Sequence, residues 1–361
     1  MLAEALGVAD RQRFEYRYGY LQTRPADVAN DLRAQGACVE CFNLDNNVSI
    51  LLGARRIARY IEEHDIKLVH AHLPLAGFVA RLAGRLKRVP VVYTEHSPIE
   101  RYHPIVRRLN VLSWRWQDQV FAISRDVEES IRRHCGGSVP VRTIWNGVNT
   151  DRFAPDIIER ADARRRIGIP EDALVVGTVA VLRPSPAKRL DIWLDAARIV
   201  REREPRAEFV IVGDGSQREQ LEARAKALGL ADAVRFVGKQ EDVRPYLAAL
   251  DVFLMSSAYE GFGIALVEAM AMGVPVVATN VEGVRNIVTS GESGLLCAFD
   301  EHVAENLADR TLRLLADPAL RTNLAAAGRE VAVERFSIGR MQAELEAIYG
   351  EVVAANERYA A

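Results

Sequence analysis

Cysteine is scarce in this chain, with four among 361 residues. A small secreted domain built on disulfides is therefore excluded, because such domains need many cysteines for their size. Cys38 and Cys41 form a C-x2-C pair, but no second cysteine pair or histidine cluster completes the ligands of a zinc site. We interpret Cys38 and Cys41 as small, buried or half-buried residues near a strand, and we expect no metal site.

Long apolar runs are also absent. No run approaches the ~18 apolar residues that a membrane-spanning helix requires, and the chain does not open with a signal-peptide pattern. The composition is otherwise ordinary for a soluble α/β protein, with 49% hydrophobic and 27% charged residues. At this length we expect two domains, each with its own core, and a cytoplasmic location.

A strong overall charge is the third feature that the chain lacks, since its formal net charge is −2. The charge is uneven, however: residues 1–150 hold 21 Lys and Arg against 16 Asp and Glu, and residues 151–361 hold 26 against 33. A basic first part and an acidic second part indicate that the two parts meet different partners. We expect no nucleic acid among these partners.

Short apolar segments alternate with longer amphipathic ones along the whole chain. This alternation predicts an α/β protein whose parallel sheets are covered by helices on both faces. Turn-forming residues dominate 145–155, which places a domain boundary near residue 155. A final helix from residue 336 has one apolar face, with Met341, Leu345, Ile348 and Val352. We expect strands at residues 67–72, 89–94, 120–124, 175–182, 208–212, 234–237, 252–255 and 275–279.

The most informative segment follows the strand expected at residues 252–255. Two serines end that strand, Gly261 and Gly263 flank an aromatic residue, and an amphipathic helix then carries Glu268. A glycine-containing loop before a helix binds anions, because its unpaired N–H groups and the helix dipole both face the ligand. The carboxylates of Glu260 and Glu268 beside such a site favour hydroxyl groups over phosphates. A ligand with both a diphosphate and sugar hydroxyls would bind the N–H groups of the loop through the diphosphate and the two carboxylates through the hydroxyls.

This segment resembles the donor-site signature of the retaining GT-B glycosyltransferases of family 4. The resemblance rests on the Glu-x7-Glu spacing of Glu260 and Glu268, on the aromatic–glycine loop between them, and on the runs Gly-x-Pro-Val-Val at 273–277 and Gly-Glu-Ser-Gly-Leu-Leu at 291–296. It implies a GT-B fold, with two Rossmann-like, doubly wound α/β domains facing across a cleft and a C-terminal helix that crosses back to the first domain. The implied parts are an acceptor-side domain at 1–155, a nucleotide-sugar donor domain at 156–335 and the returning helix at 336–361.

The start of the chain departs from that family, whose members begin with a strand and a glycine-rich loop. Residues 1–6 look like the middle of the helix that follows this loop. We expect that about 15–25 residues of the family pattern are missing, from the usual lengths of a strand, a loop and half a helix. The donor half of the family pattern is then complete here, and the acceptor half is not.

A basic loop follows the strand expected at residues 175–182, and it carries Arg183 and Lys188. Two cations at the carboxyl end of a parallel sheet can neutralise a diphosphate. The resemblance implies that they stabilise the nucleoside diphosphate as it leaves. In the family a glycine usually follows the lysine, whereas Arg189 follows it here. A solvated basic loop is the alternative interpretation.

The resemblance assigns further residues to the donor. Gly213 would turn the chain beside the nucleotide, and Gly238 and Lys239 belong to the segment that cradles the base. Glu268 would accept hydrogen bonds from ribose hydroxyls, and Glu260 would face the donor sugar as a catalytic residue. Without the resemblance, Gly213 is a simple turn, and the two glutamates are acids favoured near a helix N-terminus by its dipole. The remaining predicted donor residues are Gly261, Phe262, Gly263 and Ile264.

His96 follows the strand expected at residues 89–94, and the resemblance places it at the implied cleft as a catalytic residue. An imidazole there can hydrogen-bond a sugar hydroxyl or help to deprotonate the acceptor. A structural histidine is the alternative, as it is for His70 and His72.

A further absence concerns metal chemistry. No Asp-x-Asp occurs in the sequence, so the metal–diphosphate motif typical of GT-A transferases is missing. The resemblance implies metal-independent transfer without a cofactor, in which Arg183 and Lys188 replace the cation. It also implies retention of the anomeric configuration, by a displacement on the same face of the sugar that the leaving phosphate assists.

Residues 101–116 combine four arginines with Trp114 and Trp116, and Ile105, Leu109 and Leu112 share one helical face with Trp116. One interpretation is a basic and aromatic surface that rests on anionic lipid at the inner face of the plasma membrane and presents a lipid-linked acceptor. The other is an ordinary amphipathic helix packed on the sheet.

The sequence therefore predicts a retaining hexosyltransferase that moves a sugar from a UDP- or GDP-linked donor to a hydroxyl acceptor. The expected acceptor is a glycan or a lipid-linked saccharide in cell-surface polysaccharide synthesis. Two alternatives remain, a GT-B nucleotide-sugar epimerase and a non-catalytic protein that binds nucleotide sugars.

Overall fold

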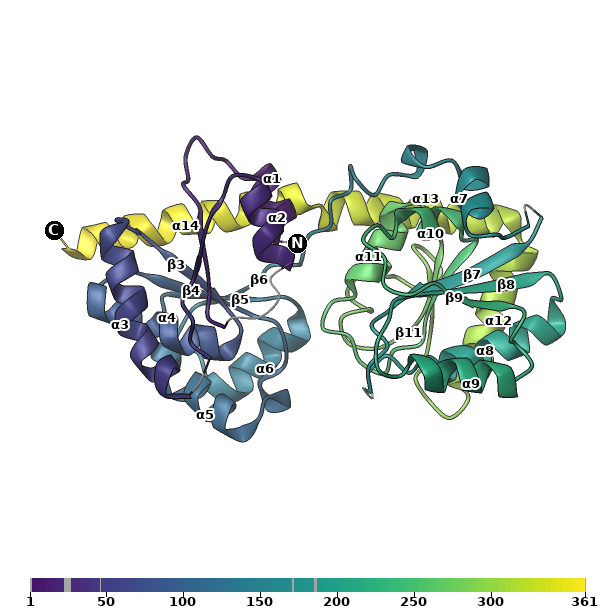
Figure 1. The fold of residues 1–361 in the computed structure, drawn as a ribbon, viewed down its shortest axis with the longest axis horizontal. Coiled ribbons are helices and arrows are strands. Elements are labelled where there is room, and N and C mark those ends of the chain that lie inside the picture. The colour runs from purple at the N-terminus through teal and green to yellow at the C-terminus, as the bar shows by residue number, and fades with distance from the viewer. Residues whose placement is uncertain (1, 23–26, 46, 171, 185–186, 361) are drawn as a thin grey trace. The chain divides into compact units, whose positions relative to one another are not determined.

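The computed structural model describes all residues except 1, 23–26, 46, 171, 185–186 and 361 (Figure 1). Its contacts divide the chain into two compact units. The first unit consists of Met1–Gly147 and Ile338–Ala361, and the second unit is Val148–Ser337. The chain enters the second unit after Gly147, earlier than the boundary expected near residue 155. Its last helix belongs to the first unit.

The first unit contains a four-stranded parallel sheet in the order β3-β4-β5-β6 and a separate parallel pair, β1-β2. The strands β3, β4 and β5 confirm those expected at 67–72, 89–94 and 120–124. The apolar pattern does not predict β1, β2 and β6, because each has only three or four residues and includes polar ones. The bounds are β1 Arg17–Tyr20, β2 Cys38–Cys41, β3 Val69–His72, β4 Val91–Glu95, β5 Gln119–Ala122 and β6 Val141–Thr143.

Helices cover both faces of the four-stranded sheet. On one face, α14 buries Met341, Leu345 and Ile348 against Val92 and Phe121, which confirms the apolar face predicted for the final helix. On the other face, α4 contacts β3 and β4. The helices of the first unit are α1 Leu2–Val8, α2 Asp27–Ala34, α3 Asn47–Glu63, α4 Pro74–Lys87, α5 Pro104–Leu112, α6 Arg125–Cys135 and α14 Ile338–Ala360, with 3₁₀ turns at Ile99–Arg101 and Trp114–Trp116.

The second unit is built on one parallel sheet in the order β12-β11-β10-β7-β8-β9. All four residues of β10 and of β11 are buried, as expected for strands covered on both faces. The chain runs outward from β7 in one direction and then returns to lay down β10 on its other side. This reversal makes the sheet doubly wound. The strands are β7 Leu174–Val179, β8 Ala207–Val212, β9 Val234–Phe236, β10 Val252–Met255, β11 Val276–Thr279 and β12 Leu295–Cys297.

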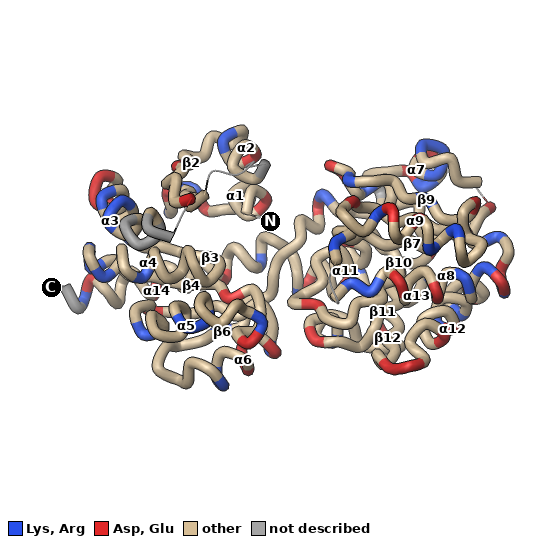
Figure 2. Tube along the Cα trace, turned by 60° about the horizontal axis from the view of Figure 1, so that its bottom comes forward, with Lys and Arg blue, Asp and Glu red and all other residues tan. Residues whose placement is uncertain are grey.

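Helices flank this sheet as well, and α7 carries a dense group of arginines (Figure 2). Two of them, Arg160 and Arg164, contact the buried carboxylate of Asp251 at 2.5 and 2.7 Å. The ion pairs tie α7 to the start of β10. The helices are α7 Arg160–Arg166, α8 Leu190–Arg203, α9 Arg218–Ala227, α10 Arg244–Ala249, α11 Ile264–Ala271, α12 Val303–Ala316 and α13 Pro318–Phe336, with a 3₁₀ turn at Pro155–Ile157.

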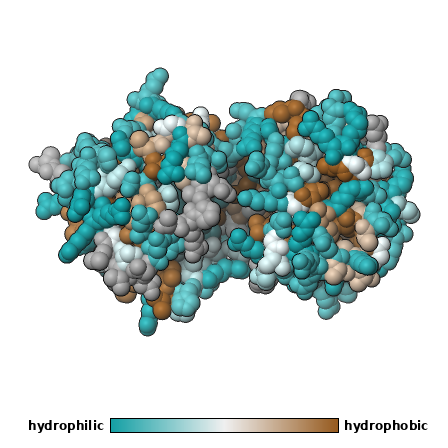
Figure 3. Space-filling view, viewed as in Figure 1, coloured by the Kyte–Doolittle hydropathy of each residue, from teal (hydrophilic) through white to brown (hydrophobic). Residues whose placement is uncertain are grey.

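Among the described residues, none of the helices combines the length and the apolar character needed to cross a membrane. On the face drawn in Figure 3, apolar side chains form scattered areas among hydrophilic ones. Cys38 and Cys41 are the first and last residues of β2, so their side chains point to opposite faces of that strand. Cys41 is half-buried as interpreted, but Cys38 is exposed, because it opens a short strand that pairs with β1 in a two-stranded sheet.

Candidate active site

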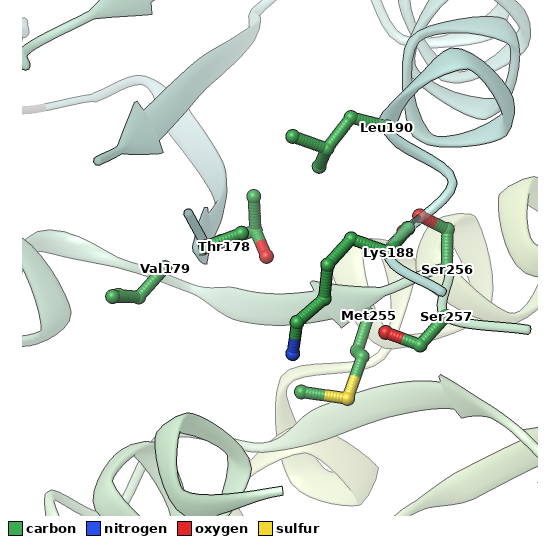
Figure 4. A pocket seen from close by; sticks show the side chains of 8 residues that line it. Thr178, Val179, Lys188, Leu190, Met255, Ser256 and Ser257 are labelled. Atoms are coloured by element: carbon green, nitrogen blue, oxygen red, sulfur yellow. Dashed lines mark hydrogen bonds between the residues drawn. The ribbon is translucent and has the colours of Figure 1, made fainter. Parts of the chain in front are cut away.

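A pocket lies where the strand order of the second unit reverses, at the carboxyl ends of β7 and β10 (Figure 4). Doubly wound sheets bind ligands at this switch point, because the loops on its two sides diverge and leave a crevice. The residues that line the pocket come from the end of β7, the start of α8 and the end of β10. They are Thr178, Val179, Ala180, Lys188, Leu190, Met255, Ser256 and Ser257.

Lys188 and Glu260 form an ion pair at this pocket. The Nζ atom of Lys188 lies 2.6 Å from Oε1 of Glu260, and the hydroxyl of Ser257 donates to the same oxygen at 2.6 Å. The side chain of Glu260 is 8% exposed and that of Lys188 is 34% exposed. The carboxylate is therefore largely buried, and the side chain of Lys188 is partly exposed.

Hydrogen bonds fasten the loop of Lys188 to the loop that follows β10. The hydroxyl of Ser256 donates to the carbonyl oxygens of Lys188 and Arg189 at 3.1 and 2.9 Å. The backbone N–H of Ala258 donates to the carbonyl of Ala187 at 2.6 Å. Two loops that are distant in sequence thus form one rigid wall of the pocket.

The predicted glycine loop leads directly into α11. Gly263 has a φ of 94°, a conformation that a residue with a Cβ adopts only with strain. Phe262 is buried, and its ring packs edge-on against Phe336 with 5.4 Å between centroids. Its side chain therefore anchors the loop. Ile264 and Glu268 are four residues apart on α11 and so share one face of it.

Gly213 and Gly238 lie opposite each other beyond the ends of β8 and β9. The N–H of Gly213 donates to the carbonyl of Gly238 at 2.9 Å. A Cβ on Gly213 would lie 1.8 Å from the carbonyl oxygen of Ala180, so the close approach to the loop after β7 requires glycine. Lys239, the next residue after Gly238, is exposed. These residues stand at the same sheet edge as the pocket, since all the strands are parallel.

Arg183 is exposed on the loop after β7, and Ser185 and Pro186 of that loop lie outside the described residues. The structure brings Lys188 to Glu260, and it does not bring Arg183 to the same carboxylate.

His96 lies in the first unit, directly after β4. Its Nε2 atom lies 3.0 Å from Nδ1 of His72, at the end of β3. Burial lowers the pKa of His96 to about 4, so the imidazole is neutral at physiological pH. A neutral imidazole offers one donor and one acceptor nitrogen, as an interaction with a sugar hydroxyl requires.

Glu95 supports the loop of His96 from beneath. It accepts the backbone N–H of His96 at 3.0 Å and the hydroxyl of Tyr102 on one oxygen. Its other oxygen accepts Tyr93 and Asn110, each at 3.2 Å. Burial raises the pKa of Glu95, and the hydrogen bonds act in the opposite direction. The backbone that carries His96 is therefore fixed by a buried polar group.

Comparison with known proteins decides the family. Residues 159–331 match the family described as "Glycosyl transferases group 1", and residues 19–152 match "Glycosyltransferase Family 4". The chain is 33% identical over 330 residues to D-inositol 3-phosphate glycosyltransferase of Saccharomonospora viridis, which covers 84% of this chain and 74% of that protein. This chain belongs to the group 1, family 4 glycosyltransferases.

Two further relatives extend the comparison. The glycosyltransferase is 32% identical over 296 residues to the GDP-mannose-dependent α-(1-6)-phosphatidylinositol monomannoside mannosyltransferase of Mycolicibacterium smegmatis, covering 78% of this chain and 76% of that one. The fold of the present chain resembles that of HepE from Anabaena, which was solved with UDP. The TM-score is 0.85, and the identity is 23% over 97% of this chain and 96% of that chain. The predicted GT-B fold is confirmed.

The basic and aromatic segment of this glycosyltransferase differs from the predicted surface in one respect. The helix α5 ends at Leu112, and the 3₁₀ turn that follows directs Trp114 into the core, where it is 1% exposed and stacks over Arg81. Ile105 and Leu112, however, are 65% and 74% exposed. The apolar face of α5 therefore points to solvent at both its ends, and Trp114 is not part of the surface.

Sequence reasoning left three contributors without an assigned role. Ser257 binds Glu260 and was visible only as a small polar residue at a strand end. His72 contacts His96, and the His-x-His pattern of β3 was the available signal. Tyr349 donates to or accepts from His70 at 2.6 Å across 279 residues, and no linear signal indicates this contact.

Proposed function

We propose that this glycosyltransferase moves a sugar from a nucleotide sugar to a hydroxyl group of a glycan or lipid-linked saccharide, with retention of the anomeric configuration. The observation that carries the proposal is the Lys188–Glu260 pair at the switch point of the second unit. The pair places a cation next to a carboxylate. In a nucleotide sugar the diphosphate, which a cation binds, lies next to the sugar hydroxyls, which a carboxylate binds.

The diphosphate would bind to Lys188, to Arg183 and to the start of α11. Lys188 is partly exposed, and its ammonium group has three donor hydrogens, so it can contact a second anion besides Glu260. The bond between the sugar and the diphosphate breaks as negative charge grows on the leaving phosphate, and fixed positive groups stabilise that charge. Lys188 and Arg183 supply these charges without a metal ion or a cofactor.

The nucleoside would lie along the loops after β8 and β9. Gly213, Gly238 and Lys239 line that sheet edge, and Glu268 would accept hydrogen bonds from the ribose. The name of one relative specifies GDP-mannose, and HepE was solved with UDP and with UDP-glucose. These names support UDP- and GDP-sugars as the first donors to test.

Glu260 would hold the hydroxyls of the donor sugar, and His96 would stand on the acceptor side. A carboxylate that already shares its charge with Lys188 and Ser257 suits hydrogen bonding to hydroxyls better than nucleophilic attack. We therefore propose displacement on the same face of the sugar, assisted by the leaving phosphate, with His96 receiving a hydrogen bond from the acceptor hydroxyl.

We also propose that the first unit rests on anionic lipid at the cytoplasmic face of the membrane. Ile105 and Leu112 at the ends of α5 are exposed, and so are Arg101, Arg108 and Arg115 before, within and after that helix. Apolar side chains among arginines favour the boundary between headgroups and acyl chains. A lipid-linked acceptor would then be presented near the first unit.

The test is a screen of UDP- and GDP-sugars for binding by calorimetry, followed by product analysis with and without acceptor saccharides. The expected result is binding of one donor and formation of a glycoside with the anomeric configuration of the donor. An inverted product would overturn retention. An epimerised sugar nucleotide formed without acceptor would identify an epimerase, and binding without turnover would identify a non-catalytic protein.

A further inference from the structure

Three histidines share one face of the sheet in the first unit. His70 and His72 alternate along β3, and in the pairing of β3 with β4 His72 lies opposite Thr94. His96 comes two residues after Thr94. Side chains two residues apart on a strand point to the same face of the sheet. His70 and His72 on β3 therefore share a face with Thr94 on β4, and His96 follows on that same side, so the three imidazoles lie together. The face is the one that α14 covers, since Val92 on it packs against that helix.

The contacts within this group form a chain that ends at His96. The hydroxyl oxygen of Tyr349 on α14 lies 2.6 Å from Nδ1 of His70, and Oγ1 of Thr94 lies 2.7 Å from Nε2 of His70. Both ring nitrogens of His70 therefore have a hydrogen-bond partner. The ring of His72 lies against that of His70, with 4.3 Å between centroids. Nδ1 of His72 then meets Nε2 of His96 at 3.0 Å.

The protonation state of the group limits the contact between His72 and His96 to one donor nitrogen and one acceptor nitrogen. Burial lowers the pKa of His72 to about 3 and that of His70 well below its ordinary value, so both are neutral. Between two neutral imidazoles one nitrogen donates and the other accepts. The 3.0 Å contact between Nδ1 of His72 and Nε2 of His96 is a hydrogen bond of this kind.

We propose that His72 is a positioning residue for His96: its Nδ1 accepts the Nε2–H of His96, which fixes the ring and leaves the Nδ1 lone pair of His96 for the acceptor hydroxyl. This inference rests on the proposed function, in which His96 stands on the acceptor side. Tyr349 and Thr94 hold His70, and His70 supports His72, so the C-terminal helix takes part in setting the orientation of His96.

Three substitutions of His72 separate positioning from packing. His72→Asn keeps an amide near the position of Nδ1, His72→Gln moves the amide to the position of Nε2, and His72→Phe removes the hydrogen bond. We expect His72→Asn to retain kcat within about threefold, and His72→Gln and His72→Phe to lose about tenfold or more, with KM for the nucleotide sugar unchanged. Tyr349→Phe, which removes only a hydroxyl, should have a smaller effect of about twofold to fivefold on kcat.

A readout that needs no turnover accompanies the kinetics. In ¹⁵N-histidine NMR spectra of the whole protein, His96 should appear as the Nε2–H tautomer, and His72→Phe should convert it to a tautomer mixture. An unchanged His96 signal in folded His72→Phe overturns the inference, and so does a loss in His72→Asn as large as that in His72→Phe. Lack of turnover by the wild type with every donor would instead count against the proposed function, while the spectra still report on the histidine pair.

Discussion

The two units of this glycosyltransferase assemble their candidate residues in different ways. In the second unit, Lys188, Ser257 and Glu260 lie on loops that follow the adjacent strands β7 and β10. In the first unit, His96 depends on His72 of another strand and, through His70, on Tyr349 of a helix at the far end of the chain. A site on neighbouring loops leaves a linear motif in the sequence. A group of residues supported by distant elements leaves only scattered signals.

The sharpest test of the second unit removes either member of its ion pair. Lys188→Ala and Glu260→Ala should each lower kcat/KM by at least about a thousandfold, because each removes a group that acts on developing charge or on the donor sugar. Steady-state transfer assays with the full-length protein measure this. Arg198→Ala, on the exposed side of α8, is the matched control and should keep the wild-type rate. Near-normal turnover in either site variant would refute the assigned roles.

The second prediction concerns the stability of the second unit. Asp251 is buried between Arg160 and Arg164 and also accepts the N–H of Val175 at 2.8 Å. Asp251→Ala leaves the buried guanidinium group of Arg164 without a counter-charge, so the free energy of unfolding of this unit should fall by about 3–4 kcal/mol. Urea titration followed by the fluorescence of Trp193, which is buried in this unit, gives the value. Asp309→Ala, at an exposed ion pair with Arg203, should cost less than about 1 kcal/mol.

The third prediction is that low pH destabilises the first unit more than the second. His72 and His96 have pKa values lowered by burial to about 3 and about 4, and that of His70 is also lowered, whereas the second unit contains a single exposed histidine, His302. The unfolded chain takes up protons at these positions near pH 6.5. It therefore binds more protons than the folded protein between about pH 6.5 and 4, and stability falls as the pH drops through this window.

The loss should be on the order of 1–2 kcal/mol for each buried histidine at pH 5. Glu95, whose pKa is raised by burial, opposes the loss at the acidic end of the window. Hydrogen exchange at pH 7 and pH 5, corrected for intrinsic rates, should show faster opening in the first unit only. Equal acceleration in both units would show that the buried histidines are not the cause.

The smallest expected effect concerns the lipid surface proposed for the first unit. Ile105→Ser combined with Leu112→Ser should weaken binding to vesicles containing anionic lipid by about tenfold, since two exposed apolar side chains are lost. Val333→Ser is the control, because Val333 is 39% exposed on α13 of the second unit. Co-sedimentation measures the difference. Binding by the wild type that is indifferent to anionic lipid would remove the membrane proposal.

The same contrast explains what could be predicted from the sequence. Glu260, Lys188 and the glycines sit at strand ends and helix starts, where residue type and spacing follow from local backbone geometry. The strands β10 and β11 were predictable because buried parallel strands are nearly continuous apolar runs. The pairing of Lys188 with Glu260 and of Tyr349 with His70 depends on tertiary packing, which no local pattern records. Trp114 was misplaced because α5 ends two residues before it, and the next turn rotates its ring inward.

Helix α14 is synthesised after the second unit although it belongs to the first, and this order affects how the protein folds. The first unit is discontinuous, because α14 completes its core with Met341, Leu345 and Ile348. Domains fold as units during translation, and earlier segments fold first. Here the second unit has its whole sequence available before the first unit does. Helix α14 is synthesised after the whole second unit and brings Tyr349 to His70, so a ribosome-bound chain can complete its second unit before its first.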